Sequence, residues 1–253
     1  MWSRLVKNEL SKKLVSGNWM SLLFNLPDKM FAGNIVQLNG NDSKAVSLAI
    51  DCLKNGNIIA IPTDTVYGLA VDASNSSAVA SLYTVKERDI SKPLAICVKN
   101  VSEIEKWGVT KDLPSGLLKS LLPGPVTVLL NRKERLNPDL NPGVKKVGIR
   151  VPGMTYPFIH LVTAALGRPL ALTSANLSNE PNCIYPEEFR VLWPKLGAVF
   201  VTSVKQLEET NKSREGSTIV DLSVVGNFTI TRRGIAYIQT LEILKKYGLV
   251  ENV

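Results

Sequence analysis

Four clusters of polar side chains stand where predicted strands end, and their residue types are suited to holding anions. The clusters are Thr63, Asp64 and Thr65; Arg150; Thr173, Ser174, Ala175 and Asn176; and Arg232 with Arg233. Three further cations, Lys86, Arg88 and Lys92, stand close together in one charged run. The combined set has several cations, many hydroxyls and few acids, so it suits a polyanion bound beside a small polar molecule.

The segments that must position these clusters alternate between helices and strands. We predict helices over 43–55 and 76–85, near 104, and over 115–122, 156–166, 186–193 and 239–246. We predict strands over 58–61, 94–98, 126–131, 147–151, 170–174, 198–202, 217–222 and 228–232. This alternation predicts one α/β domain with a twisted, mixed, largely parallel sheet covered by helices. Ligands gather at the carboxyl ends of strands in such sheets, so we expect a concave basic cleft there.

Composition excludes several classes of protein. A chain of 253 residues that is 45% apolar can bury a substantial core, and no apolar run is long enough for a transmembrane segment. Cys52, Cys97 and Cys183 are far apart and His160 is the only histidine, which argues against a disulfide framework or a zinc site. The net charge of +8 favours an anionic partner, either a nucleotide, RNA or a membrane surface.

The first 33 residues differ in composition from the rest of the chain. Basic residues outnumber acidic ones there, with Arg4, Lys7, Lys12, Lys13 and Lys29 against Glu9 and Asp28. This pattern fits a mitochondrial targeting segment or a disordered extension equally well. We therefore expect residues 1–33 to be an N-terminal extension and residues 34–253 to form the functional domain.

Each cluster taken alone has a simpler structural explanation. Thr63 and Asp64 after a strand could form a local turn or a helix cap, and Lys86 to Lys92 could be a solvated helix end. Signatures of common nucleotide-binding and hydrolytic enzymes, including GxxxxGK[ST], GxGxxG, HExxH and GxSxG, do not occur. The joint occurrence of the clusters is what favours a binding site of another kind.

Seven segments stand in an order that resembles the YrdC-like family, the threonylcarbamoyl-AMP synthases. They are "IPTDTVYGLA", "KERDISKPLAICV", "LLPGPVTVLL", "VGIRVP", "LALTSANLS", "GSTIVDLS" and "ITRRG". The resemblance covers about residues 36 to 250 and is greatest to the eukaryotic single-domain form, including the ending "LKKYGL". It implies condensation of L-threonine, bicarbonate and ATP into threonylcarbamoyl-adenylate and pyrophosphate. A separate tRNA threonylcarbamoyl transferase complex would then modify an adenosine beside the anticodon.

The resemblance also implies roles for individual residues. Lys86 and Arg88 are the expected catalytic residues. The expected ATP-binding residues are Lys86, Arg88, Lys92, Ser174, Asn176 and Arg232. The expected threonine-binding residues are Thr65, Tyr67, Arg150, Thr173 and Ser217. No residue is expected to ligate a metal, because ATP would carry the Mg²⁺.

Three positions depart from the family pattern. Glu87 stands where many relatives have glycine, Arg233 replaces a usual proline, and Cys97 replaces a histidine that contacts threonine in microbial members. A cysteine at that position is compatible with the eukaryotic branch. The resemblance implies a cytoplasmic enzyme that also acts in mitochondria if residues 1–33 direct it there.

The alternative is a non-catalytic module that binds double-stranded RNA or tRNA through phosphate contacts. Its basic face would comprise Lys133, Arg135, Lys145, Lys146, Lys205, Lys212, Arg214, Lys245 and Lys246. A solvated surface explains the same residues without any partner. A third option, a related carbamoyl-transferring enzyme, would require extra metal-binding domains.

Overall fold

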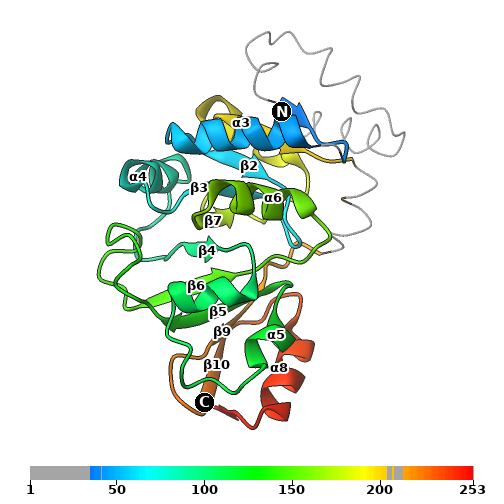
Figure 1. Cartoon of the computed structure of the whole chain (residues 1–253). Helices are drawn as coiled ribbons and strands as arrows, with labels where there is room; N and C mark the ends of the chain where they lie inside the picture. The colour runs from blue at the N-terminus through cyan, green and yellow to red at the C-terminus, as the bar shows by residue number, and fades with distance from the viewer. Residues whose placement is uncertain (1–34, 41, 204–206, 208–212, 253) are drawn as a thin grey trace. The chain divides into compact units, whose positions relative to one another are not determined.

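Helices and strands alternate along the chain around one mixed sheet (Figure 1). The computed structural model describes residues 35–40, 42–203, 207 and 213–252. The strands are β1 (Ile35–Gln37), β2 (Ile59–Ile61), β3 (Gly68–Asp72), β4 (Ala95–Cys97), β5 (Val126–Asn131), β6 (Lys146–Arg150), β7 (Leu170–Ser174), β8 (Ala198–Val201), β9 (Thr218–Asp221), β10 (Asn227–Arg232) and β11 (Val250–Glu251). The prediction for residues 1–33 lies outside the described residues.

The helices fall close to their predicted positions. They are α3 (Ser43–Lys54), α4 (Ser76–Val85), α5 (Leu117–Leu121), α6 (Pro157–Leu166) and α8 (Tyr237–Lys246), with 3₁₀ helices η1 (Val101–Lys106) and η2 (Pro186–Lys195). None of the described helices is long and apolar enough to cross a membrane.

The described strands lie in the order β1-β8-β2-β3-β7-β4-β6-β5-β9-β10-β11. The pairs β1·β8, β2·β8, β4·β6, β5·β9 and β10·β11 are parallel, and the other five neighbouring pairs are antiparallel. The sheet is therefore mixed, as predicted, but parallel pairs are not in the majority. Strand β3 is one reason, because the sequence predicted no strand there and β3 pairs antiparallel with both β2 and β7.

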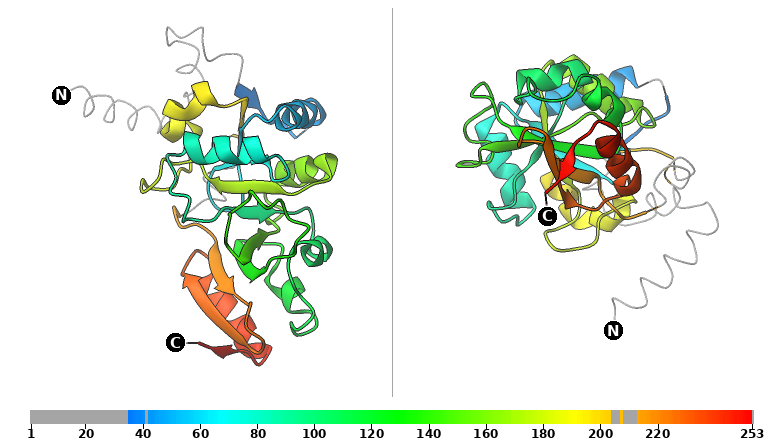
Figure 2. Two further views of the ribbon diagram at one scale, coloured as in Figure 1. Left: turned by 90° about the vertical axis from the view of Figure 1, so that its left-hand side faces the viewer. Right: turned by 90° about the horizontal axis from the view of Figure 1, so that it is seen from below.

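The main core lies between α3, α6 and one face of the sheet. Ala45, Ala49 and Leu53 of α3 are buried at the spacing of one helix face. They belong to one cluster with Phe158 of α6 and Phe200 of β8, whose ring centroids are 4.7 Å apart. Figure 2 (left) shows α3 and η2 on opposite sides of the sheet, so helices cover the central strands on both faces.

The other end of the domain is built on β9, β10 and α8, and it depends on a close backbone approach. After β10 the chain turns at Gly234, whose backbone lies against that of Gly216 and Ser217. A Cβ atom at Gly234 would lie 2.3 Å from the Gly216 carbonyl oxygen and 2.4 Å from the Ser217 carbonyl carbon. Glycine is therefore required here, because a backbone cannot move aside as a flexible side chain can.

We predict that Gly234→Ala lowers the free energy of unfolding by about 3 kcal/mol or more, as measured by urea denaturation. The matched control is Gly248→Ala, since Gly248 has φ +76° and nothing within 4 Å of its Cβ position. The control should lose only about 1 kcal/mol, which is the conformational cost of a left-handed alanine. Equal losses in the two variants would contradict the role of the backbone contact.

Candidate active site

A cavity of about 150 Å³ collects most of the predicted site residues from across the chain. Predicted residues among its lining are Thr65, Tyr67, Arg88, Arg150, Thr173, Ser174, Ser217 and Arg232. Lys86, Lys92 and Asn176 are not among the lining residues. All four polar clusters at the predicted strand ends thus contribute residues to one cavity.

Strand pairing explains how these distant residues meet. Thr173 and Ser174 end β7 opposite β3, which begins at Gly68 directly after the loop over 62–67. Arg150 ends β6 beside Cys97 of β4. Because β5 runs antiparallel to β6 and parallel to β9, the first residues of β5 and β9 also reach this site. The site therefore includes strand beginnings as well as the strand ends that the sequence indicated.

The hydroxyls of Thr63 and Thr65 form a directional chain of hydrogen bonds. Thr63 Oγ1 donates its proton to the Val66 carbonyl at 2.7 Å, so its 3.2 Å contact with Thr65 Oγ1 must use the Thr65 proton. Arg150 Nη2 donates to Thr65 Oγ1 at 3.3 Å. The Thr65 hydroxyl proton is therefore used in the bond to Thr63 Oγ1, and Thr65 can offer a ligand only an oxygen lone pair.

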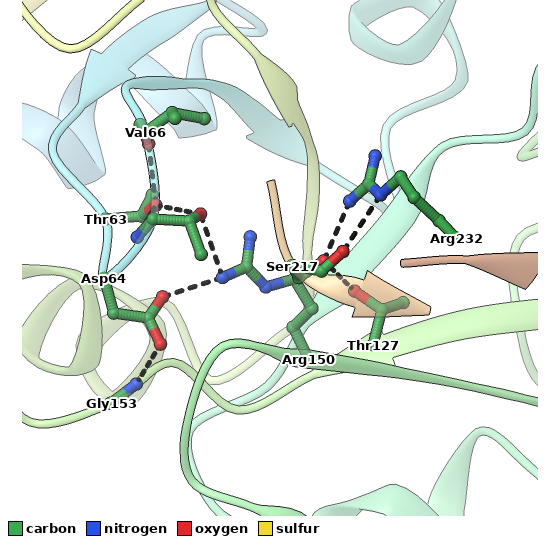
Figure 3. A network of polar contacts seen from close by, with 9 residues as sticks. Thr63, Asp64, Val66, Thr127, Arg150, Gly153, Ser217 and Arg232 are labelled. Carbon is green, nitrogen blue, oxygen red and sulfur yellow. Dashed lines mark hydrogen bonds and ion pairs between the residues drawn. The ribbon is translucent and has the colours of Figure 1, made fainter. Parts of the chain in front are cut away.

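Arg150 is held by a buried ion pair with Asp64 (Figure 3). Its Nη2 lies 2.7 Å from Asp64 Oδ1, and Asp64 Oδ2 accepts a 2.6 Å hydrogen bond from the Gly153 amide. Arg150 Nε is buried without a hydrogen-bond partner among the described residues. The sequence indicated Arg150 as a substrate ligand, but it did not indicate that Asp64 anchors it.

Opposite this pair, Thr127, Ser217 and Arg232 form a second chain (Figure 3). Thr127 Oγ1 and Ser217 Oγ are 2.7 Å apart, and Arg232 donates from Nη2 to Ser217 Oγ and from Nε to the Ser217 carbonyl, both at 2.9 Å. Thr127 lines the cavity but was not predicted. The sequence signal for Thr127 was a hydroxyl inside the apolar strand "VTVLLN". A hydroxyl buried in such a strand needs a hydrogen-bond partner, and this need could have indicated a polar neighbour.

Arg88 is positioned by backbone carbonyls rather than by acids. Its Nε donates to the Lys92 carbonyl at 2.9 Å and its Nη2 to the Pro93 carbonyl at 3.0 Å. The remaining terminal nitrogen, Nη1, lies 3.4 Å from Thr173 Oγ1 at the cavity wall. The side chain of Lys92 is exposed and its Nζ bonds Asn179 Oδ1 at 2.9 Å, so Lys92 fixes the loop that carries Arg88.

Lys86 lies behind the cavity wall with only 1% of its surface exposed. Its Nζ donates to the Ser174 carbonyl, and Ser174 Oγ is 3.5 Å away. Burial, followed by the nearby positive charge of Arg88, lowers the pKa of Lys86 to about 8. Lys86 therefore carries its charge at neutral pH but loses it in mildly alkaline solution.

Two other predicted side chains are used mainly to build the structure. Asn176 Nδ2 donates to the carbonyls of Leu177 and Glu180, each at 2.7 Å, which ties down the loop after β7. Tyr67 lines the cavity, but its side chain is wholly buried and its ring centroid lies 5.4 Å from that of Phe189. Burial raises the pKa of Tyr67 above its usual range.

The cavity lining contains three arginines and, within the described residues, no aspartate or glutamate. The pKa of Arg232 is lowered first by burial and then by the positive charges of Arg150 and Arg88. Clustered cations that repel one another in this way are stabilised by an anionic ligand. The composition of the lining would therefore suit an anionic ligand.

The three departures from the family pattern lie outside the cavity lining. Glu87 is exposed and has φ +49°, a left-handed conformation that explains why glycine would suit this position. Burial raises the pKa of the Cys97 thiol to about 12. The Arg233 guanidinium carbon lies 4.9 Å from the centroid of the Tyr237 ring, which turns it toward α8.

Comparison with known proteins shows which family this chain resembles. A family model described as "Telomere recombination" (Sua5/YciO/YrdC) matches residues 51–234. Threonylcarbamoyl-AMP synthase of Bos taurus is 44% identical over 213 residues, which cover 84% of this chain and 76% of that protein. The Homo sapiens protein of the same name is 44% identical over 211 residues, covering 83% of this chain and 75% of that protein.

Among solved structures, P. abyssi Sua5 complexed with L-threonine has a TM-score of 0.73 at 23% identity. The match covers 86% of this chain but only 62% of the Sua5 chain, less than two thirds of its length. At this identity the likeness shows the fold alone. With a family model over most of the chain and 44% identity to the mammalian proteins, the chain belongs to the Sua5/YciO/YrdC family.

Proposed function

We propose that this protein is a threonylcarbamoyl-AMP synthase, which condenses L-threonine, bicarbonate and ATP into threonylcarbamoyl-adenylate, pyrophosphate and water. The observation that carries the proposal is the cavity in which Arg88, Arg150 and Arg232 converge among hydroxyls, with no acidic residue among the described residues of the lining. A triphosphate and a carboxylate are the groups that such a lining binds best. The 44% identity to mammalian proteins of this name supports the same reaction.

The reaction requires positioning and charge stabilisation, but no nucleophile from the protein. The threonine amine captures carbon dioxide derived from bicarbonate as a carbamate, and a carbamate oxygen attacks the α-phosphorus of ATP and expels pyrophosphate. Arg88 and Arg232, both held by neutral groups, keep their charge for the phosphoryl oxygens. Holding the carbamate in line with the α-phosphorus supplies the rest of the rate enhancement.

We assign threonine to the wall formed by Arg150 and Thr65. Arg150 has donors left over from its bond to Asp64, and these suit the threonine carboxylate. Thr65 can only accept, so it suits the amine or hydroxyl of threonine. Ser217 closes the pocket on the other side, bonded to Thr127.

Mg²⁺ would enter with ATP. The cavity lining offers arginines and hydroxyls but no carboxylate, and the described residues contain no group of three or more His, Cys, Asp or Glu that could hold a metal ion. Hard divalent cations bind most strongly to anionic oxygens, which here belong to the phosphates. Mg²⁺ would therefore neutralise phosphate charge that the arginines do not reach.

The proposed product is a reactive mixed anhydride, so an acyl-transfer enzyme must consume it. We propose a tRNA threonylcarbamoyl transferase complex as that consumer and the cytoplasm as the site of synthesis, with mitochondria added if residues 1–33 act as a targeting segment. The basic face that the alternative RNA-binding function would use is partly neutralised, because Lys146 pairs with Asp221 and Arg214 pairs with Glu188. Lys205 and Lys212 lie outside the described residues.

We predict that the purified protein releases pyrophosphate from ATP and bicarbonate only when L-threonine is present. Thr65→Val removes the lone-pair acceptor and should lower kcat/KM for threonine about tenfold, whereas Thr65→Ser should keep most of it. Arg135→Ala is the control, because Arg135 is exposed and packs on Trp107 outside the cavity. Folded protein that binds RNA in a salt-dependent way but releases no pyrophosphate would support the alternative and overturn the proposal.

We also predict that ATP affinity falls as pH rises through about 8, because the pKa of Lys86 is lowered to about 8 and the neutral amine no longer attracts phosphate. Calorimetric titration with Mg-ATP, without threonine, at about pH 7 to about pH 9.5 measures this effect. Lys86→Met, which is similar in shape and uncharged at every pH, should bind weakly at neutral pH with a flat profile. A flat profile for the unmodified protein would exclude a contribution from Lys86.

A further inference from the structure

Asp64 bridges two segments that are far apart in the sequence. It lies in the loop between β2 and β3, while its partners Arg150 and Gly153 lie at and just beyond the end of β6. The side chains of Asp64 and Arg150 are only 5% and 9% exposed. One carboxylate therefore fixes both the arginine side chain and the backbone that follows it, in a place where few waters can compete.

The bridge uses one nitrogen of the Arg150 guanidinium and leaves the other two without a bond to a described residue. Nη2 bonds Asp64 Oδ1 at 2.7 Å and Thr65 Oγ1 at 3.3 Å. Neither Nε nor Nη1 bonds another described residue. In Figure 3 the bound nitrogen points to Asp64, whereas the other terminal nitrogen points into the space between Thr63 and Ser217. The unbound terminal nitrogen, Nη1, is thus aimed before any ligand arrives.

Asp64 also gives Arg150 a charge environment unlike that of the other two arginines in the cavity. Arg88 and Arg232 are bonded to carbonyls and hydroxyls, so their charges are not neutralised by the protein. Arg150 is paired with a carboxylate at 2.7 Å. An arginine whose charge is balanced by a carboxylate attracts a triphosphate less strongly than an unpaired arginine does. It still offers directed hydrogen-bond donors to a singly charged carboxylate.

We propose that Asp64 is a positioning residue that holds Arg150 for the threonine carboxylate and keeps Arg150 from binding the triphosphate. The proposal rests on the threonylcarbamoyl-AMP synthase function proposed above. Asp64 itself contacts no substrate, because it does not line the cavity. Its action is to remove the conformational freedom that Arg150 would otherwise lose when threonine binds.

The test is steady-state kinetics of Asp64→Asn with threonine and ATP varied separately. We expect KM for threonine to rise about tenfold, kcat at saturating threonine to fall less than about threefold, and KM for ATP to stay the same or fall. The matched control is Asp221→Asn, because Asp221 pairs with Lys146 at the other end of β6 at 2.5 Å and lies outside the cavity lining. The control should leave both KM values unchanged.

Two further variants separate positioning from a merely structural role. Gly153→Ala keeps every polar group but places a Cβ atom 3.3 Å from Asp64 Oδ2, so it should displace the carboxylate and raise KM for threonine about two- to threefold. If Asp64 acts only through Arg150, the double variant Asp64→Asn with Arg150→Lys should have the threonine KM of Arg150→Lys alone. Gly153→Ala also serves as the test if Asp64→Asn fails to fold.

A threonine KM within about twofold of the unmodified value in Asp64→Asn would overturn the positioning role. If that variant does not fold, a threonine KM within about 1.3-fold of the unmodified value in Gly153→Ala would overturn it. Equal losses of kcat for all substrates with unchanged KM would do the same, since they would show only a loss of active protein. In both cases threonine-dependent pyrophosphate release by the unmodified protein would leave the proposed function standing. No such release by the unmodified protein would overturn both.

Discussion

Mutual repulsion among three arginines in one small cavity is the constraint that the rest of the site must satisfy. Burial and the neighbouring cations Arg150 and Arg88 lower the pKa of Arg232, which shows that the ligand-free site disfavours its own charge. The fold tolerates this by surrounding Arg88 and Arg232 with carbonyls and hydroxyls, which satisfy their donors without cancelling their charge. An anionic ligand would relieve the repulsion that remains among these charges.

The mixed sheet is what brings these cations together. An all-parallel sheet would present only strand ends at one edge, whereas antiparallel pairing of β5 with β6 places the beginning of β5 beside the end of β6. Thr127 and Ser217 therefore come from the beginnings of strands, and Arg150 and Arg232 from strand ends. The two hydrogen-bond chains that face each other in Figure 3 follow from this alternation of direction.

Local patterns were enough to predict the α/β class, most helix positions and the clusters at the strand ends. They did not reveal β3, because the hydroxyl-rich residues before the buried run Gly68–Asp72 were interpreted as the end of one strand and not as a loop between two antiparallel strands. Lys92 and Asn176, which the resemblance implied as ATP-binding residues, lie outside the cavity lining and bond neighbouring loops, because a side chain that bonds a loop looks the same in sequence as one that faces a ligand.

Asp64 shows most clearly what sequence could not supply. Its partner Arg150 is 86 positions away, so no local spacing connects them, and a turn was the simplest explanation of an aspartate after a strand. Thr127 was hidden for the same reason, since its partner Ser217 is 90 positions away. Which groups pair across a site is decided by strand register, and register is a property of the whole sheet.

Of the three arginines, only Arg150 is paired with an acid, and this difference would matter in a site that holds two anions at once. A triphosphate carries more charge than a carboxylate, so three equivalent arginines would all be drawn to the phosphates. Pairing Arg150 with Asp64 would weaken it in that competition, whereas Arg88 and Arg232, which are not paired with acids, would remain in it. In the proposed synthase, one buried carboxylate would thus help to separate the place of the amino acid from that of the nucleotide.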